Sequence, residues 1–404
     1  MRAGWIKLPL GEALDTVTGG TPPKSNTDLY GNFIPLVKPP ELRDASLDSA
    51  EDGLSEIGAK VARIAPVNSI LVSCIGNLGK IGRNTVRVAF NQQINAILPN
   101  EKTAIPAFMF YQARSDSFRN QLEALASGTT VPIVNKSKFN SIEIVLAPLS
   151  EQQRIVAILD EAFDGIATAK ANAEKNLQNA RDLFQLSFGY AVRKLDQAKW
   201  KRLTVSDIAV AKKGAMRTGP FGSQLLHSEF VEEGIAVLGI DNAVANEFRW
   251  GKNRCITPEK FKQLGRYRVL PGDVLITIMG TCGRCAVVPD DIPVAINTKH
   301  LCCITLDRAK CLPEFLHAYF LYHPVAQEFL ARQAKGSIMS GLNMGIIQAL
   351  TVLLPPLDVQ VALVDKLNAL REKTQHLESL YQQKLAALDE LKKSLLHQAF
   401  SGEL

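Results

Sequence analysis

The 404-residue chain lacks several features that would place a protein in a class at once. No run of about 18 apolar residues occurs, so we expect no transmembrane helix. Its start, Met1-Arg2-Ala3-Gly4-Trp5, has no apolar signal-peptide core. The seven cysteines are odd in number and irregularly spaced, and six of them lie from Cys255 onward. This pattern argues against a disulfide framework and predicts a reducing, cytoplasmic location.

Two motifs of catalytic sites are also missing. Gly79-Lys80 is followed by Ile81, where a phosphate-binding loop needs Ser or Thr. Lys38-Pro39-Pro40 differs from the Asn/Asp-Pro-Pro-aromatic motif of amino-methyltransferases, and no glycine-rich cofactor loop precedes it. We therefore expect a chain that is not an enzyme and that holds no metal or cofactor of its own.

Positive charge is present in modest excess and is unevenly distributed. The formal net charge is +6. Residues 1–149 hold 15 Lys/Arg against 13 Asp/Glu, and residues 201–356 hold 18 against 13. Such an excess is compatible with a polyanionic partner, but many proteins without one would show it too.

The most informative positive feature is an internal repeat. Trp5-Ile6-Lys7-Leu8 returns as Trp200-Lys201-Arg202-Leu203, and Pro148-Leu149-Ser150-Glu151-Gln152 returns as Pro356-Leu357-Asp358-Val359-Gln360. Between these ends the sequences align Gly19 with Gly214 and Asn91 with Asn297. The offset grows in steps, which indicates one framework with loops of variable length.

Each copy combines strand and helix patterns. Short apolar runs at 70–75 and 274–279 precede the glycine loops Gly76-Asn77-Leu78-Gly79 and Gly280-Thr281-Cys282-Gly283. Further strands are expected at 142–146 and 349–354, each stopped by proline, and helices at 107–126 and 313–334. The predicted fold class is α+β, with two tandem domains of mixed α/β character, each followed by a long helix.

Cys282 and Cys285 have the spacing of metal ligands. Their equivalents in the first copy, Leu78 and Ile81, are apolar. A zinc site needs four ligands within tetrahedral reach. The repeat therefore favours packing cysteines over a metal site.

The two long helices share a 4-3 spacing of seam positions, which is typical of a coiled coil. The first seam is mostly small and the second large, and small facing large allows close packing. Asn176 and Lys384 are polar interruptions at equivalent positions. We expect an antiparallel coiled coil with pseudo-two-fold symmetry. The seam positions are Ile155, Leu159, Ala162, Ile166, Ala169 and Leu183 in the first helix, and Leu363, Leu367, Leu370, Leu377, Tyr381, Leu388, Leu391 and Leu395 in the second.

Over its whole length the chain resembles the specificity subunit of type I restriction-modification systems. The matching segments are Thr18-Gly19-Gly20-Thr21-Pro22, Ile70-Leu71-Val72-Ser73, Phe90-Asn91-Gln92-Gln93-Ile94-Asn95-Ala96, and residues 128–136, 146–156 and 391–404. The order of two variable domains, each followed by a long helix, is more specific than any single motif. The second copy departs from the pattern at residues 336–343 and at Thr298-Lys299, which replace a proline-containing loop and two glutamines.

The resemblance implies a non-catalytic subunit with target recognition domains at 1–149 and 196–356 and spacer helices at 150–195 and 357–404. Each recognition domain would read one half of a bipartite, asymmetric site in double-stranded DNA. The helices would dock two modification (methyltransferase) subunits, which restriction (helicase-nuclease) subunits join. S-adenosylmethionine, ATP and Mg would be bound by those partners, and no membrane partner is expected.

Lysines and arginines near the glycine loops are the candidates for DNA contact, because Arg suits guanine readout and Lys suits phosphate. Asn91, Gln92 and Gln93 could read adenine edges or, as strand residues, satisfy backbone groups instead. The basic candidates are Lys24, Lys38, Arg43, Lys80, Arg83 and Lys136 in the first copy, and Lys213, Arg217, Arg249, Lys252, Arg284 and Lys299 in the second.

A second interpretation stays open at this point. The chain could be a duplicated scaffold protein whose coiled coil is an interaction module and which does not bind DNA. This interpretation predicts no DNA affinity even with partners present. The first predicts that one bipartite sequence is bound far more tightly than random DNA, with salt-sensitive affinity.

Overall fold

The computed structural model describes residues 4–128, 130–193, 200–335 and 341–404. The chain forms two compact units. The first unit comprises the chain up to Lys175 together with Gln382–Leu404, and the second comprises Asn176–Tyr381. Each unit therefore contains one mixed α/β domain and a part of both long helices. The predicted boundary at 195/196 lies outside the described residues.

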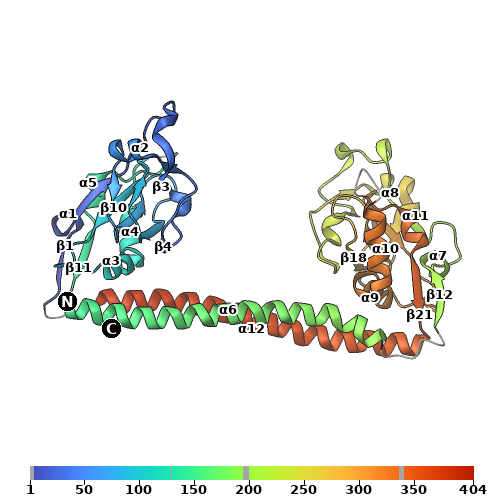
Figure 1. The fold of residues 1–404 in the computed structure, drawn as a ribbon. Helices are drawn as coiled ribbons and strands as arrows, with labels where there is room; N and C mark the ends of the chain where they lie inside the picture. The colour runs from blue at the N-terminus through green and yellow to red at the C-terminus, as the bar shows by residue number, and fades with distance from the viewer. Residues whose placement is uncertain (1–3, 129, 194–199, 336–340) are drawn as a thin grey trace. The chain divides into compact units, whose positions relative to one another are not determined.

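The first half of the chain is built from short strands and helices that end in one long helix (Figure 1). The elements are β1 (Ile6–Pro9), α1 (Leu10–Ala13), β2 (Asp15–Thr18), η1 (Thr27–Leu29), β3 (Tyr30–Val37), η2 (Pro39–Glu41), β4 (Ala45–Leu47), β5 (Gly53–Leu54), α2 (Glu56–Val61), β6 (Ile64–Ala65), β7 (Ile70–Ser73), β8 (Ile81–Asn84), β9 (Val88–Phe90), β10 (Ile94–Leu98), α3 (Pro106–Ala113), α4 (Asp116–Ala124), α5 (Lys136–Asn140), β11 (Glu143–Leu146) and α6 (Leu149–Arg193).

The second half repeats this plan. Its elements are β12 (Lys201–Thr204), α7 (Val205–Ile208), β13 (Met216–Thr218), η4 (Gly222–Gln224), η5 (His227–Glu229), β14 (Ile235–Leu238), η6 (Ile240–Asn242), β15 (Cys255–Ile256), α8 (Pro258–Leu264), η7 (Gly265–Tyr267), β16 (Arg268–Val269), β17 (Val274–Thr277), β18 (Cys285–Val287), β19 (Ala295–Asn297), β20 (Leu301–Ile304), α9 (Pro313–Tyr322), α10 (Pro324–Lys335), α11 (Met344–Ala349), β21 (Thr351–Leu354) and α12 (Leu357–Ser401).

The sheet topology confirms the duplication that the sequence predicts. In the first unit the sheets have the orders β2-β10-β7-β8-β4 and β5-β3-β9-β6, with β1 paired to β11. In the second unit the orders are β13-β20-β17-β18 and β15-β14-β19-β16, with β12 paired to β21. In the smaller sheet of the first unit and in its counterpart in the second, the central pairing, β3 with β9 and β14 with β19, is parallel, whereas the pairs that flank it are antiparallel. The fold is thus one α+β framework built twice.

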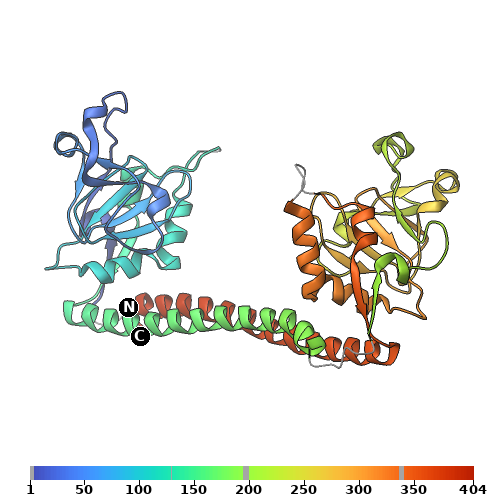
Figure 2. The same cartoon turned by 45° about the vertical axis from the view of Figure 1, so that its right-hand side comes forward.

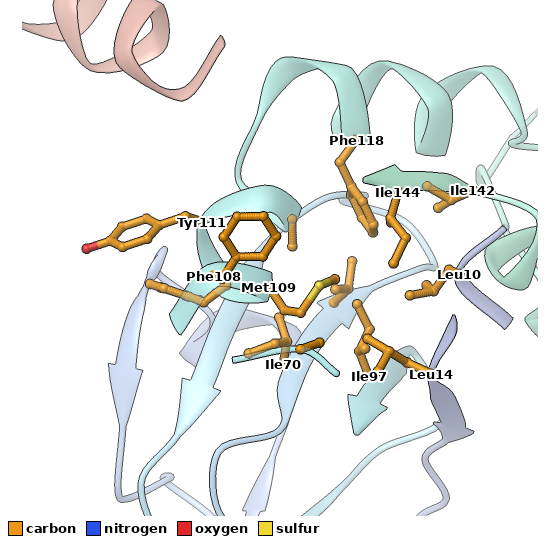
Figure 3. Packing of buried hydrophobic residues seen from close by; sticks show 14 of the residues in the cluster. Leu10, Leu14, Ile70, Ile97, Phe108, Met109, Tyr111, Phe118, Ile142 and Ile144 are labelled. Atoms are coloured by element: carbon orange, nitrogen blue, oxygen red, sulfur yellow. The ribbon is translucent and has the colours of Figure 1, made fainter. Parts of the chain in front are cut away.

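The main core of the first unit lies between its larger sheet and the helices α3 and α4. Figure 3 shows Ile70 and Ile97 of the sheet facing Phe108 and Met109 of α3, and all four are fully buried. The same cluster includes Leu159 of α6 and Leu396 and Ala399 of α12. The first α/β domain and the ends of the long helices therefore share one hydrophobic core.

The predicted helices at 107–126 and 313–334 were each wrong in one respect, because each is a pair of helices. In the first pair the break between α3 and α4 lies at Ser115, whose side chain accepts a hydrogen bond from the amide of Phe118 and caps α4. In the second pair His323 is extended, with φ −81° and ψ 129°, because the following Pro324 disfavours the helical conformation. Both breaks let the second helix turn back against the domain.

Within each unit α6 and α12 run antiparallel, as predicted (Figures 1 and 2). In the first unit Arg154 donates to the carbonyl of Leu404 and Lys170 pairs with Asp389 at 2.8 Å. In the second unit Arg181 pairs with Glu378 at 3.2 Å. The partner number falls as the α6 number rises, which defines the antiparallel direction. None of the helices in the described ranges is long and apolar enough to cross a membrane.

The polar interruptions predicted for the seam are not in it. Asn176 and Lys384 are exposed, whereas the following Leu177 and Leu385 are half-buried. The seam therefore takes an additional four-residue step near the middle of each helix. A straight helix of 3.6 residues per turn drifts away from a 3.5-residue repeat, and such a step corrects the drift. The polar side chains reach water without an unpaired group inside the interface.

The same step explains which seam positions differ from the prediction. Leu183, Leu377 and Leu391 are 50%, 37% and 46% exposed, so they flank the interface. Thr374 is buried, and its hydroxyl is within 3.1 Å of the carbonyl of Leu370. The other seam positions are buried or half-buried: Ile155, Leu159, Ala162, Ile166, Ala169, Leu363, Leu367, Leu370, Tyr381, Leu388 and Leu395.

The ion pairs Lys170–Asp389 and Arg181–Glu378 occupy equivalent positions of the repeat, but equivalent positions carry opposite charges. At the offset of 208 residues, Lys170 corresponds to Glu378 and Arg181 to Asp389. The α6 partner is basic and the α12 partner acidic in both pairs. Two copies of α6 in the same register would place Lys170 against Arg181, with like charges opposed. The charges therefore favour the pairing of α6 with α12 over the pairing of like helices.

Reversing one of these charges is expected to lower stability slightly and in a salt-dependent way. Arg181→Glu would oppose Glu378 and lower the free energy of unfolding of the second unit by less than about 1 kcal/mol, because exposed ion pairs contribute little. The double variant Arg181→Glu/Glu378→Arg should recover it. Urea denaturation at low and high salt measures the effect. No recovery in the double variant would show that the two side chains do not interact.

Candidate nucleic-acid interface

The glycine loop between β7 and β8 is a rigid turn that presents Lys80. Gly76 and Gly79 have φ values of +75° and +71°, which residues with a side chain rarely adopt. The Ser73 hydroxyl donates to the carbonyl of Asn77 at 2.5 Å and accepts from the amide of Lys80 at 2.9 Å. The hydroxyl thus closes the loop from inside and fixes the backbone of Lys80.

Three other segments are hydrogen-bonded to this glycine loop or to each other. The amide of Cys74 donates to the carbonyl of Gln93 at 2.7 Å, and that of Gly76 to the carbonyl of Pro132 at 2.9 Å. The Thr21 hydroxyl donates to the Gln92 amide oxygen at 2.9 Å. We call residues 19–26, 74–80, 91–93 and 132–136 together the first loop face.

The second unit builds the same arrangement. Gly280 and Gly283 have φ values of +72° and +79°. The Thr277 hydroxyl donates to the carbonyl of Thr281 at 2.5 Å and accepts from the amide of Arg284 at 2.9 Å. The amide of Ile278 donates to the carbonyl of His300 at 2.9 Å. Residues 219–226, 278–284 and 298–300 form the second loop face, and residues 336–340, which were predicted to depart from the pattern, lie outside the described residues.

These contacts correct two alignments made from the sequence. Gly19 corresponds to Gly219 and not to Gly214, because Thr18 and Thr218, which precede them, end the equivalent strands β2 and β13, paired with β10 and β20. An added Cβ would lie 2.1 Å from the carbonyl oxygen of Asn91 at Gly19, and 2.0 Å from that of Asn297, the residue before Thr298, at Gly219. Only glycine permits this close approach of two backbone segments. The Gly214 alignment failed because the second copy carries extra residues before β13.

The second correction concerns the polar turn, residues 91–93 between β9 and β10. Its counterpart in the second copy lies one residue later than the sequence alignment placed it. The amide of Asn91 donates to the carbonyl of Val37, and the amide of Thr298 donates to that of Leu238, at 3.0 and 2.9 Å. Asn91 therefore corresponds to Thr298, and Gln92 corresponds to Lys299. Sequence identity had aligned Asn91 with Asn297, which instead occupies the last position of a buried strand.

The structure places five of the first-copy candidates on the first loop face. Lys24, Lys136 and Gln92 are exposed, and Lys80 is half-buried. Asn91 lies between strands and not within one; it is 7% exposed and its amide group bonds to Gln93 at 2.9 Å. Asn91 therefore holds the turn and is not positioned to reach a base.

The remaining first-copy candidates flank this face. Lys38 follows Val37, whose carbonyl holds the polar turn, and its ammonium group pairs with Asp52. Arg43 is exposed and precedes Asp44, whose amide donates to the carbonyl of Ile81 at 2.8 Å. The side chain of Arg83 lies near α3, with its guanidinium 5.8 Å from the ring centre of Phe110.

The second-copy candidates lie in four different places. Arg284 and Lys299 lie on the second loop face, exposed and half-buried respectively. Arg249 and Lys252 are exposed in the irregular segment before β15, where Arg249 pairs with Glu247. Lys213 is exposed before β13. Arg217 is 9% exposed and forms an ion pair with Asp273, so its guanidinium supports the fold.

Two residues on or beside these faces were missed. His300 lies on the second loop face, and partial burial, followed by the nearby cations Lys299 and Arg254, lowers its pKa. The shift favours the neutral imidazole, which can donate or accept a hydrogen bond. Arg63 is exposed, and its guanidinium donates to the carbonyl of Thr18 at 2.8 Å. The corrected repeat alignment, which places His300 opposite Gln93, would have identified the histidine; no signal in the sequence pointed to Arg63.

The cysteines of the second unit pack in its cores. Cys285 and Cys302 are fully buried in one hydrophobic cluster and Cys303 in another. Burial raises the pKa of Cys302 to about 12, so the group stays a thiol. Within the described ranges no group of three or more His, Cys, Asp or Glu residues could hold a metal ion. Cys285 thus packs inside this core, and Cys282 packs against it partly buried.

Comparisons with known proteins agree with this duplicated design. The HindI specificity subunit of Haemophilus influenzae is 31% identical over 189 residues, which cover 45% of this chain and 40% of that protein. The EcoKI specificity subunit of Escherichia coli is 23% identical over an alignment that covers 99% of this chain and 89% of that protein. Both are named as specificity subunits of type I restriction enzymes.

Solved structures share the fold. The HsdS subunit from Thermoanaerobacter tengcongensis superimposes with a TM-score of 0.60 at 18% identity and covers 100% of this chain and 98% of its own. A chain from a study of complex assembly and conformational transition of the type I R-M system gives 0.80 at 20% identity, covering 100% and 99%.

The family assignment rests on the two halves together. The model of the type I restriction modification DNA specificity domain matches residues 3–178 and again residues 198–386. Each match includes one recognition domain with its glycine loop and the beginning of the helix that follows it. The chain therefore belongs to the family of type I restriction-modification DNA specificity subunits.

Proposed function

We propose that this chain directs a type I restriction-modification complex to one bipartite, asymmetric DNA site, each recognition domain reading one half. A specificity subunit is the non-catalytic component that supplies sequence recognition. The observation that supports recognition of two different half-sites is the pair of loop faces. Both faces have the same backbone hydrogen bonds but present different side chains. Lys80 of the first face is replaced by Arg284 in the second, and Gln92 by Lys299. One frame with two sets of side chains suits two different half-sites.

The proposed contacts fall on the exposed parts of these faces. Arg284 is suited to bidentate guanine readout, and Lys24, Lys80, Lys136 and Lys299 are suited to phosphates. Gln92 is exposed and can read an adenine edge once it releases Thr21. Arg217 and Asn91 are left out of the proposed interface because both are buried.

The long helices are proposed to space the two domains and to dock two modification subunits. On α6 in the second unit, Leu183, Leu186 and Tyr190 are 50%, 72% and 60% exposed. Their spacing of three and four residues places them on one helix face, and an exposed apolar face of this kind suits a partner helix. The modification subunits would bring S-adenosylmethionine, and restriction subunits would bring ATP and Mg. The assembled complex would act in the cytoplasm.

Binding of DNA by the protein with its modification partner tests the proposal. One bipartite duplex, found by selection from a random library, should bind at least about 10³-fold more tightly than random duplex. Affinity should fall steeply as salt rises. Fluorescence anisotropy measures both. Equal affinity for all duplexes would contradict the proposal, and no affinity for any duplex would support the scaffold interpretation.

A single substitution shows whether each domain reads its own half-site. Arg284→Gln should weaken discrimination at one base pair by about 1–3 kcal/mol, the usual loss for a bidentate base contact, and should leave the other half-site unaffected. The matched control is Arg332→Gln, an exposed arginine on α10 of the same unit. Equal losses at both half-sites would show that Arg284 acts through general charge.

A further inference from the structure

The second copy contains a short insertion that the first copy lacks. One residue, Leu14, separates α1 from β2, whereas residues 209–215 separate α7 from β13. The inserted loop is ordered by backbone hydrogen bonds: the amide of Val210 donates to the carbonyl of Thr305, and the amide of Thr305 to that of Ala215, at 3.0 and 2.8 Å. It carries the adjacent lysines Lys212 and Lys213, and both are exposed.

This insertion forms one wall of a basic cavity. The cavity has a volume of about 570 Å³, and the facing wall comes from η7 and β16, with Arg266 and Arg268. Arg217 also lines it, but its charge is balanced by Asp273. No carboxylate lines the cavity, and none of the four remaining cations forms an ion pair with any described residue. Four uncompensated positive charges around one hollow attract a polyanion.

The cavity lies beside the second loop face. Tyr267, which also lines it, donates its hydroxyl to the amide oxygen of Gln224 at 2.8 Å. Gln224 belongs to the segment 219–226 of that face. The guanidinium of Arg266 lies 4.8 Å from the ring centre of Tyr267, so the aromatic ring supports one of the cations. A DNA strand on the loop face would thus continue past these charges.

We propose that this cavity binds backbone phosphate of the DNA that flanks the half-site read by the second domain. Contacts from lysine and arginine to phosphate oxygens position the DNA but do not distinguish bases. The cavity therefore contributes affinity and register but no sequence preference. Because the insertion exists only in the second copy, the second domain holds DNA more strongly by charge than the first. The inference rests on the proposed function and adds to it an electrostatic asymmetry between the two domains.

The test compares two double variants of the full chain in complex with its modification partner. Lys212→Gln/Lys213→Gln removes two charges from the cavity. The control Lys201→Gln/Lys262→Gln removes two exposed lysines of the same unit that do not line it. The probes are a random-sequence duplex and the selected bipartite duplex, titrated by anisotropy from low to high salt.

The cavity variant should weaken binding to both duplexes by the same factor, so that their ratio stays unchanged. The slope of log affinity against log salt should become shallower by roughly 0.9 for each phosphate that the variant no longer neutralises, hence by about 1–2. The control should keep the wild-type slope. Equal slopes for the two variants, or a change in the ratio of the two affinities, would overturn the proposal.

A free phosphate-containing anion could occupy the cavity instead of DNA, and a separate competition experiment tests this. Inorganic phosphate or ATP is added at constant ionic strength. Any displacement of duplex by these anions should be the same for the wild type and for the cavity variant. Competition that depends on Lys212 and Lys213 would assign the cavity to a small anion and overturn its assignment to DNA. A wild-type protein without sequence preference would instead overturn the proposed function, while the slope comparison would still report on the cavity.

Discussion

Replacing Arg217 by methionine is expected to lower the free energy of unfolding of the second unit by about 3–5 kcal/mol, the usual cost of leaving one partner of a buried ion pair alone. The side chain of Arg217 is 9% exposed and that of its partner Asp273 is 1% exposed. Methionine fills a similar volume, so the loss would come from the uncompensated carboxylate and not from a cavity.

The position of this pair in the fold makes the effect large. Arg217 lies on β13 of one sheet, and its guanidinium donates to the carbonyl of Arg268 on β16 of the other sheet at 2.9 Å. Asp273 accepts from the Thr305 hydroxyl at 2.6 Å and from the amide of Leu270 at 2.8 Å. The network therefore ties the two sheets of the second unit together, and its loss would loosen their packing.

Hydrogen exchange read by mass spectrometry is the suitable measurement, because a chain with two units does not unfold in one step. Amides of β13, β16 and β17 should exchange faster in Arg217→Met, and those of the first unit should not change. The matched control is Arg249→Met, which breaks an exposed arginine–glutamate pair in the same unit and should have a small effect. Similar exchange in both variants would show that burial of the pair does not matter.

Arg217 also shows how far sequence reasoning reaches at the site. A basic residue near glycines predicts a DNA contact, and burial cannot be deduced from the residue itself. Its partner Asp273 is 56 residues away in the chain. By contrast, Lys80 and Arg284 were placed correctly at the ends of glycine loops, because turn chemistry is local: glycine at positive φ and a hydroxyl that closes the turn. Whether those side chains contact DNA remains a prediction.

The fold was predictable where it depends on periodicity and duplication. Buried strands such as β7 and β17 and the two long helices follow from apolar patterns and from the repeat. The insertion before β13 and the one-residue shift at Thr298 were not found, because identical residues, Gly214 and Asn297, offered a false alignment. The four-residue step of the coiled coil was missed for a related reason. The leucines in the sequence fit a strict heptad repeat, but Leu377 and Leu391 are exposed on the folded helix.

The second large effect concerns Gln152, which fastens the first recognition domain to α6. It is fully buried, and its amide accepts from the amide of Ile105 at 2.8 Å and donates to the carbonyls of Thr103 and Ala147, at 2.9 and 2.8 Å. Gln360, its equivalent in the second copy, makes the same three bonds with Leu312, Lys310 and Pro355. One side chain thus joins three segments at the junction of domain and helix in each unit.

Gln152→Leu is expected to lower the free energy of unfolding of the first unit by about 2–4 kcal/mol. Leucine has nearly the volume of glutamine but leaves one amide and two carbonyls buried without partners, at about 1–3 kcal/mol for each group that finds no water. Gln153→Leu, at the exposed neighbouring position of α6, is the matched control. Hydrogen exchange should rise at α3 and at the first turn of α6 in Gln152→Leu alone. Unchanged exchange at α3 would show that the three bonds do not hold the junction.

Gln152→Glu separates hydrogen bonding from packing, because it keeps the shape of the side chain. A carboxylate can accept from Ile105 but can only repel the carbonyls of Thr103 and Ala147, whereas a protonated carboxyl can donate to one of them. Burial and these carbonyls should hold the pKa of the introduced carboxyl above its ordinary value of about 4.3. The neutral form is then the one that fits, so stability relative to wild type should be greatest at acidic pH and fall as pH rises through the folded-state pKa. If the difference from wild type did not vary between pH 4 and 8, the junction would depend on shape alone. If it varied as expected, Gln360→Glu should reproduce the profile in the second unit, because the same three bonds hold each domain to its helix.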